Sequence, residues 1–307
     1  MKEKLNSLFG GLTKTVIGSE GASRLLLMAL VAEGHVLIQG APGLGKTTLC
    51  NSLAKSIDCS FSRIQFTPDL LPSDIVGYSI FDKKENDFRF IEGPIFKNIV
   101  LADEINRTSP RIQSAMLEAM NERQVSVDGQ SRDLQSPFMV IATQNTLYSA
   151  GTFPLPEPQL DRFLISIELT HPDAATQTEI LKMHACGAQN DPVQTVLHSE
   201  ELKQIQIGVS NFKVSDEICR YIVNLCEAVR ASDEFKNEVS SRGAIAVMKA
   251  SKACAYFNGH SAVFPEDVKE IFIPVLAHRL FLKNRTKSEY QTIRKFLANI
   301  LAETRVP

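Results

Sequence analysis

The chain has 307 residues, of which 44% are hydrophobic and 22% charged, and its formal net charge is -2. This length allows two domains with a sizeable core, and the near-neutral charge argues against a broad nucleic-acid-binding surface. The six cysteines form no C-x-x-C pair, which argues against a zinc site and for reduced, buried thiols. Because no signal peptide and no bilayer-length apolar run is present, we expect a soluble cytoplasmic protein without a membrane segment.

Residues 2 to 33 carry apolar residues at helical spacing, and we expect helices that break at Gly10-Gly11 and again near Gly18. The segment Val16-Ile17-Gly18 lies between two predicted helices. Two interpretations of it stay open. A short apolar corner before a phosphate loop often packs against the nucleotide base, and the same residues also suit a plain helix-connecting turn.

A phosphate-binding loop follows a short apolar strand at residues 36–39 and leads into a helix at Thr47. The pattern G-x-x-x-x-G-K-[ST] is matched without exception by Gly40, Ala41, Pro42, Gly43, Leu44, Gly45, Lys46 and Thr47, with Thr48 after them. The glycines let backbone N–H groups turn toward a phosphate. Lys46 would reach the β- and γ-phosphates, and the Thr47 hydroxyl would ligate Mg²⁺. The sequence therefore predicts ATP and Mg²⁺ as cofactors.

Further along, buried apolar strands separated by helices indicate a parallel α/β sheet. The strand at residues 98–104 ends in two carboxylates. Asp103 is placed to hold Mg²⁺ directly or through water, and Glu104 can accept a proton from the attacking water. A strand that ends in Asp-Glu is also compatible with simple strand-end polarity. Downstream of a complete phosphate loop we favour the catalytic interpretation.

Two more residues are candidates for catalysis. Asn145 closes the strand at residues 138–143, where it would orient the water or touch the γ-phosphate, although asparagine is also a common turn residue. Arg162 is a candidate transition-state cation. Its alternative is a surface ion pair with Asp161 or another acid.

Two insertions and a helical half complete the chain. Thr67 to Pro94 is a long irregular excursion with a possible hairpin tipped at residues 82–87, and Gln124 to Gln135 pairs two strands around Asp128-Gly129. Past Pro172 we expect only helices, at residues 174–185, 199–208, 215–231, 242–257, 265–280 and 288–302. We therefore expect a nucleotide-binding core with N-terminal helices at residues 1–170 and a helical domain at residues 171–307.

The phosphate loop, LADEINR, the second hairpin, ATQN and LDRF, in this order, resemble the MoxR family of AAA+ ATPases. The resemblance covers nearly the whole chain and includes the runs TPDLLPSD, EAMNERQV, GTFPLPE and PVLAHR. It implies an αβα core with an all-helical lid, and assembly into a hexameric ring with nucleotide between neighbouring subunits.

The resemblance also implies roles for single residues. Asn145 is similar to sensor 1, Arg162 to the finger that reaches the ATP of the next subunit, and Arg242, in SSRGA, to the sensor 2 that folds the lid onto the γ-phosphate. Two departures from the family pattern lie beside these residues, and a third is Ser19, where the family usually has glutamine. Thr146 follows Asn145 where the family usually has proline, and the proline before Arg242 is absent.

For the remaining segments, Val16-Ile17-Gly18 resembles the base-side contact of the family. The excursion at Thr67–Pro94 and the hairpin at Gln124–Gln135 resemble its two insertions, which would move with nucleotide state and touch the substrate or pore. Arg107 is a second basic candidate near the subunit boundary.

The leading functional hypothesis is a Mg²⁺-dependent ATPase that drives chaperone-like remodelling or maturation of a protein client or a metal-cofactor complex. The resemblance implies a separate partner with a von Willebrand factor A domain. The alternative, a nucleic-acid motor or restriction-type translocase, predicts a basic, aromatic-bearing surface. A near-neutral charge and the absence of tryptophan argue against it. A third possibility is a scaffold that binds ATP only to assemble.

Overall fold

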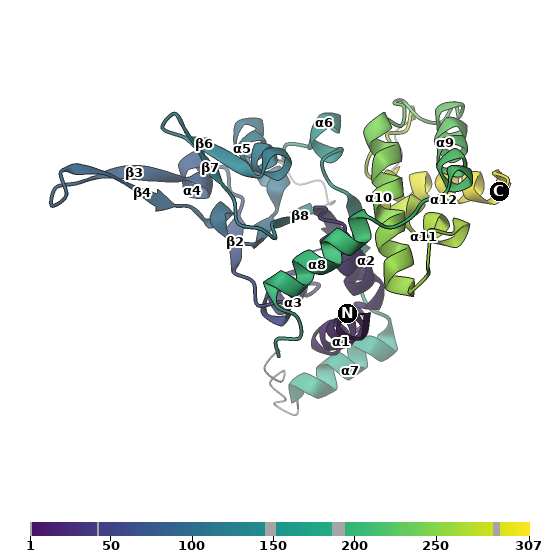
Figure 1. The fold of residues 1–307 in the computed structure, drawn as a ribbon, viewed down its shortest axis with the longest axis horizontal. Helices are drawn as coiled ribbons and strands as arrows, with labels where there is room; N and C mark the ends of the chain where they lie inside the picture. Colours follow the sequence, from purple (N-terminus) through teal and green to yellow (C-terminus); the bar gives the residue numbers. More distant parts are fainter. Residues whose placement is uncertain (1, 42, 145–151, 186–193, 285–288) are drawn as a thin grey trace.

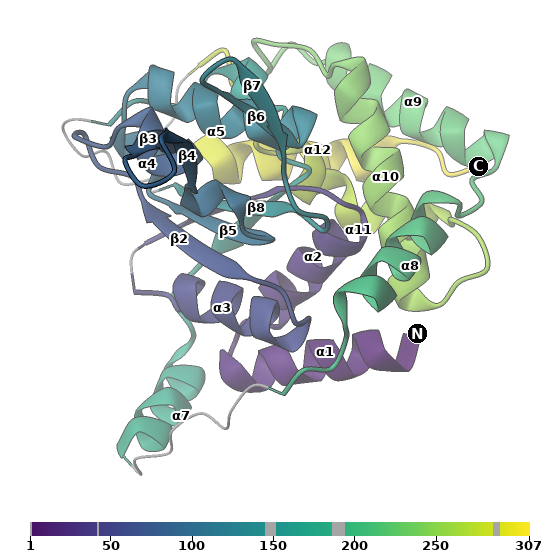
Figure 2. The ribbon, with the colours of Figure 1, turned by 60° about the vertical axis from the view of Figure 1, so that its left-hand side comes forward.

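The computed structural model describes residues 2–41, 43–144, 152–185, 194–284 and 289–307. Figure 1 shows an α/β core at its centre, a group of C-terminal helices on one side, and a long two-stranded hairpin that projects from the other side. The same hairpin turns toward the viewer in Figure 2.

A five-stranded parallel sheet forms the centre of the core. Its strand order is β2 (Phe61–Gln65), β5 (Ile99–Asp103), β8 (Met139–Gln144), β1 (Val36–Gly40) and β9 (Ile165–Leu169). Successive apolar side chains point to opposite faces, so that Ile38 and Leu101 join one hydrophobic cluster while Leu37 and Val100 join another. Strands buried on both faces require helices on both faces. The predicted αβα core is confirmed.

The helices of the core cover the two faces of this sheet. One cluster contains buried residues of α1 (Lys2–Thr15), α2 (Glu20–Val31) and α3 (Lys46–Ser56). The other contains residues of α4 (Pro72–Val76), α5 (Pro110–Glu122) and α6 (Glu157–Leu160). Two short 3₁₀ helices, η1 (Pro94–Phe96) and η2 (Ile105–Arg107), flank β5.

The expected break at Gly10-Gly11 is wrong, because α1 runs through both glycines. Leu5, Leu8 and Leu12 lie on one face of this helix and are almost fully buried. Their burial, worth about 2 kcal/mol each, exceeds the cost of about 1 kcal/mol for a glycine in a helix. The break near Gly18 is present, between the end of α1 and the start of α2.

Both predicted hairpins are present. The projecting one consists of β3 (Gly77–Asp82) and β4 (Asp87–Glu92), and the shorter one of β6 (Gln124–Val127) and β7 (Gln130–Asp133). In the shorter hairpin Asp128 and Gly129 have φ values of 53° and 75°, as a type I′ turn requires.

Helices dominate the described C-terminal residues. They are α7 (Ala174–Ala185), α8 (Ser199–Ser210), α9 (Asp216–Arg230), α10 (Ser241–Asn258), α11 (Pro265–Leu276) and α12 (Glu289–Glu303). Each lies within a few residues of its predicted range, although α11 ends earlier than expected. Helix α10 packs against α2, and α11 packs against β9, so the helical region rests on the core. Among the helices described, none combines the length and apolarity needed to cross a bilayer.

Candidate functional site

A cavity of about 450 Å³, here called the phosphate-loop cavity, opens at the carboxyl edge of the sheet. Its wall includes Gly43 and Gly45, whose φ values of 84° and 75° favour glycine. Lys46 and Thr47 begin α3 and line the same cavity, and Lys46 Nζ donates to the Gly40 carbonyl at 3.0 Å. Burial lowers the pKa of Lys46, and nearby carboxylates oppose the shift.

Asp103, the last residue of β5, is held at both carboxylate oxygens. Oδ1 accepts a hydrogen bond from Thr143 Oγ1 at 2.6 Å. Oδ2 accepts two from Arg63, at 2.7 Å from Nη2 and 3.1 Å from Nε. Thr143 Oγ1 also accepts the Glu104 N–H at 2.8 Å. One hydroxyl of β8 thus orients both acidic residues at the end of β5.

Glu104 lies in the left-handed region, with φ 57°. Its Oε2 accepts a hydrogen bond from Gln65 Nε2 at 3.1 Å and lies 3.2 Å from Nε of Arg107. Two donors therefore fix its carboxylate, and the carboxylate lines the phosphate-loop cavity beside Asp103. Arg107, expected near a subunit boundary, contacts Glu104 of its own chain.

Sequence reasoning missed Arg63 and Gln65, which also line this cavity. A signal was present, because the two polar residues flank Ile64 and so share one face of a strand. In the parallel register Gln65 pairs with Asp103, which brings that face to the acidic pair.

The donor atoms in this cavity suit Mg²⁺. Thr47 offers a hydroxyl and Asp103 a carboxylate, both oxygen ligands of the kind that this hard cation prefers. Ala41, Leu44 and Thr48 complete the described part of the loop around them, while Pro42 lies outside the described residues.

A second cavity, of about 270 Å³, lies at the opposite edge of the sheet. We call it the basic cavity, and its charged lining consists of Glu33, Arg123, Asp161, Arg162, Arg242, Lys249 and Arg279. Its wall also includes the residues directly before β1 and β9. Five residues of β1, at about 3.3 Å each, separate it from the phosphate loop by ~17 Å.

The structure thus brings Arg162 and Arg242 together and keeps both away from the phosphate loop of their own chain. Arg162 Nη1 donates to the Leu117 carbonyl, and its Nε is buried with no hydrogen-bond partner among the described residues. Arg242 is exposed, and within the described ranges it makes no ion pair.

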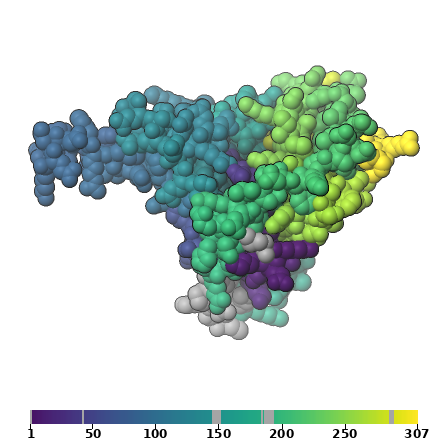
Figure 3. Space-filling model, viewed as in Figure 1, coloured from purple at the N-terminus to yellow at the C-terminus, as the bar shows by residue number. Residues whose placement is uncertain are grey.

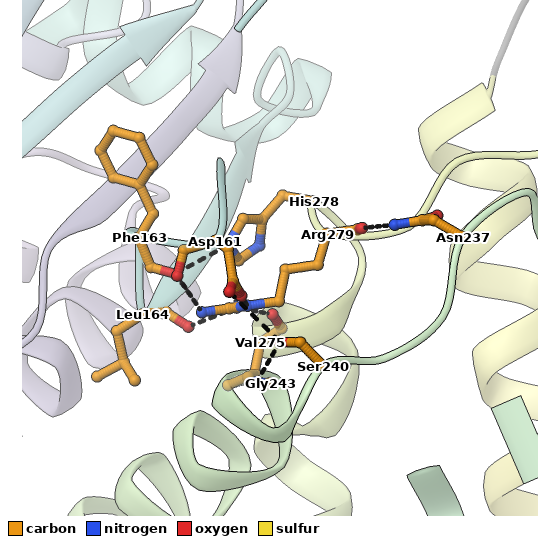
Figure 4. Close-up of polar contacts among 9 residues, drawn as sticks. All are labelled: Asp161, Phe163, Leu164, Asn237, Ser240, Gly243, Val275, His278 and Arg279. Carbon is orange, nitrogen blue, oxygen red and sulfur yellow. Dashed lines mark hydrogen bonds and ion pairs between the residues drawn. The ribbon is translucent and has the colours of Figure 1, made fainter. Parts of the chain in front are cut away.

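A buried polar network joins Asp161 and Phe163, the two chain neighbours of Arg162, to the helical region (Figure 4). Arg279 Nε donates to Asp161 Oδ1 at 2.9 Å, and its Nη2 donates to the Phe163 carbonyl at 2.6 Å. His278 Nε2 lies 3.0 Å from the same carbonyl, and Ser240 donates to Asp161 Oδ2 at 3.3 Å. The two chain neighbours of Arg162 are therefore held by residues that follow α11 and by the residue directly before α10.

The remaining candidates flank the phosphate loop. A Cβ on Gly45 would lie 3.2 Å from Val16, which places Val16 against the loop, and Ile17 follows it. Gly18 lines a third cavity, of about 250 Å³, together with Leu169 and residues of α11 and α12. Asn145 lies outside the described residues.

Comparison with known proteins identifies the family. A family model described as "ATPase family associated with various cellular activities (AAA)" matches residues 35–165, and an AAA lid domain model matches residues 227–296. A crystal structure of an ATPase candidate from Cytophaga hutchinsonii matches with a TM-score of 0.89 and 34% identity, over 100% of this chain and 96% of that one.

Relatives match over most of their length as well. The uncharacterised protein YeaC of Bacillus subtilis is 41% identical over 100% of this chain and 97% of its own. The chaperone MoxR1 of Mycobacterium tuberculosis is 36% identical over 88% of this chain and 73% of its own, and the protein MoxR of Paracoccus denitrificans is 33% identical over 88% and 86%. The chain therefore belongs to the MoxR family of AAA+ ATPases.

Proposed function

We propose that the protein hydrolyses ATP with Mg²⁺ and uses the hydrolysis to remodel or mature a protein client or a metal-cofactor complex. One observation carries the proposal: Lys46, Thr47, Asp103 and Glu104 line a single cavity. Held by Thr47 and Asp103, Mg²⁺ would neutralise negative charge on the β- and γ-phosphates. The name of the relative MoxR1, a chaperone, supports the remodelling part.

Within this cavity each residue has a separate task. Backbone N–H groups of residues 40–48 and the Lys46 ammonium bind the phosphates. Glu104 accepts the proton of the attacking water, after its carboxylate releases a contact to Gln65 or Arg107. Asn145 orients that water, and Val16, Ile17 and Gly18 contact the base.

Arg162 and Arg242 act on the nucleotide of a neighbouring copy. They lie at the far end of β1 from their own phosphate loop, yet phosphoryl transfer needs a cation at the γ-phosphate in addition to those of the loop. The active assembly is therefore a ring, and the resemblance to the family implies six copies. Each chain is divided near residue 170 into a core (1–170) and a lid (171–307).

The projecting hairpin is the proposed contact with the client. Tyr78, Ile80, Phe81 and Phe88 on β3 and β4 are between 44% and 68% exposed, and Figure 3 shows that the hairpin stands clear of the remaining surface. Exposed apolar groups that cluster in this way mark interaction sites. A separate protein with a von Willebrand factor A domain is the proposed partner.

Steady-state ATP hydrolysis over a range of protein concentrations, with Arg162→Ala beside the wild type, tests this proposal. We expect specific activity to rise with concentration, and the variant to bind ATP without turning it over. If specific activity does not change with protein concentration and Arg162→Ala turns over ATP at the wild-type rate, the active site is not shared between copies. Strong stimulation by DNA would instead favour the nucleic-acid motor.

A further inference from the structure

The basic cavity is more cationic than two catalytic arginines require. Its lining holds five cationic and two acidic side chains, a formal charge of +3, in a chain whose net charge is -2. Both acids are already engaged within the cavity. Asp161 pairs with Arg279 at 2.9 Å, and Glu33 pairs with Arg123. The other three cations, Arg162, Arg242 and Lys249, make no ion pair within the part of the chain that the structure describes.

Arg123 and Lys249 reach this cavity from two different parts of the fold. Arg123 ends α5 with φ 53°, a left-handed conformation that few residues other than glycine adopt. Lys249 lies on α10, seven residues after Arg242 and hence on the same helix face. Its Nζ lies 3.4 Å from the Glu33 carbonyl. Burial lowers the pKa of Lys249, the carboxylate of Glu33 opposes this shift, and the nearby Arg123 adds to it, so the two cations repel one another.

We propose that Arg123 and Lys249, together with Arg162 and Arg242, bind the phosphates of a nucleotide held in the phosphate-loop cavity of a neighbouring copy. Glu33 is the internal counterion that this triphosphate replaces at Arg123. The inference rests on the proposed ring.

Charge complementarity supports this occupant. Lys46 and Arg63 balance Asp103 and Glu104 in the phosphate-loop cavity. The proposed Mg²⁺ offsets only part of the charge of a triphosphate bound there, so negative charge remains unmatched. A cationic cavity on the adjoining copy stabilises that charge and favours this one orientation of the two copies.

Single substitutions that remove one charge test the inference, because loss of a cation and loss of Glu33 should have opposite effects on activity. We expect Arg123→Gln and Lys249→Gln each to lower kcat about tenfold or more, since removal of one donor to a developing charge is commonly worth at least this much. Binding of a fluorescent ATP analogue to dilute protein should stay unchanged. Glu33→Gln should move half-maximal activity to a lower protein concentration. Lys252→Gln is the matched control, because its Nζ donates to Ser210 outside the cavity.

A mixing experiment separates action on a neighbour from a structural role. Lys46→Ala keeps the basic cavity and loses the phosphate site, whereas Arg123→Gln/Lys249→Gln does the reverse. If each variant alone is inactive and their mixture regains activity, the cations act on the other copy. Inactivity of the mixture would overturn the inference, as would a double variant with wild-type kcat. If the wild type itself shows no dependence on concentration, the proposed ring fails first.

Discussion

Asp161 Oδ1 and Arg279 Nε lie 2.9 Å apart, and this pair joins the nucleotide-binding core to the helical region directly beside Arg162. The Arg279 side chain is only 7% exposed. Its guanidinium also holds the Phe163 carbonyl, so the ion pair and the backbone contact fix the segment that carries Arg162. We therefore expect a change in the position of the helical region to alter the position of this arginine.

We expect Asp161→Asn to lower the free energy of unfolding by about 3 kcal/mol, because it leaves a buried guanidinium without its counterion. ATP turnover should fall as well, since Arg162 loses its fixed neighbour. Urea unfolding measures the first effect. The control is Arg294→Gln, which breaks the more exposed pair with Glu168 and should cost about 1 kcal/mol or less. If both variants lost the same amount of unfolding free energy and of ATP turnover, the Asp161–Arg279 pair would have no special role in fixing Arg162.

Glu104→Gln should reduce turnover roughly a thousandfold, within the range for loss of a general base, and leave ATP binding intact. The amide has the size of the carboxylate but accepts no proton from water. Single-turnover hydrolysis and nucleotide binding, measured on the same sample, separate the two effects. Glu227→Gln on α9, where Glu227 pairs with Arg230, is the control. If Glu104→Gln hydrolysed ATP at the wild-type rate, Glu104 would not be the general base.

Stability should fall in mild acid because of His35. Burial lowers its pKa to about 4, and the nearby cations Arg123 and Lys249 add to the shift. Its Nδ1 accepts the Val140 N–H at 2.9 Å while Nε2 lies 3.0 Å from the Met120 carbonyl, so the neutral ring satisfies both groups and a second proton breaks one contact.

The folded state of His35 therefore binds fewer protons than the unfolded state between pH 6.5 and about 4. The stabilisation is complete above pH 6.5 and is lost as the pH falls toward 4, by about 3 kcal/mol in total. Urea unfolding at several pH values gives the free energy of unfolding as a function of pH. Between pH 6.5 and about 4 this free energy should fall less steeply in His35→Gln than in the wild type. An equal dependence of the unfolding free energy on pH in His35→Gln and in the wild type would contradict the assignment.

Removal of the aromatic pair on the projecting hairpin should weaken client binding with little effect on the fold. Phe81 and Phe88 face each other across β3 and β4, with ring centroids 5.4 Å apart, and are 51% and 68% exposed. Phe81→Ser/Phe88→Ser should change the free energy of unfolding by about 0.5 kcal/mol or less, as surface changes usually do. Capture of an unfolded test protein, measured by light scattering, should decrease. Undiminished capture would argue against the hairpin as the contact.

The strand, loop and helix around the phosphate loop could be predicted because they follow one another in the chain. Apolar runs marked the strands, and Asp128-Gly129 marked a hairpin that the structure confirms. The sequence also showed that Gly10 and Gly11 would destabilise a helix. The compensating burial of Leu5, Leu8 and Leu12 was not, because it depends on helices that follow later in the chain.

The basic cavity could not be predicted for the same reason. Glu33, Arg123 and Lys249 come from segments far apart in the sequence, and each alone reads as an ordinary surface charge. Arg63 was missed although its alternation with Ile64 was visible, because only the parallel register with β5 brings it to Asp103. Roles that depend on such long-range pairing appear only in the folded chain.

The two cavities lie at opposite ends of β1, and this gives any assembly built on them a direction. Each copy would complete the site in front of it and depend on the copy behind it, so contacts run head to tail. An open row of copies always leaves one phosphate loop without its arginines, at one end. Only a closed ring gives every phosphate loop its arginines. A pair of copies joined by one such contact would have a single complete active site.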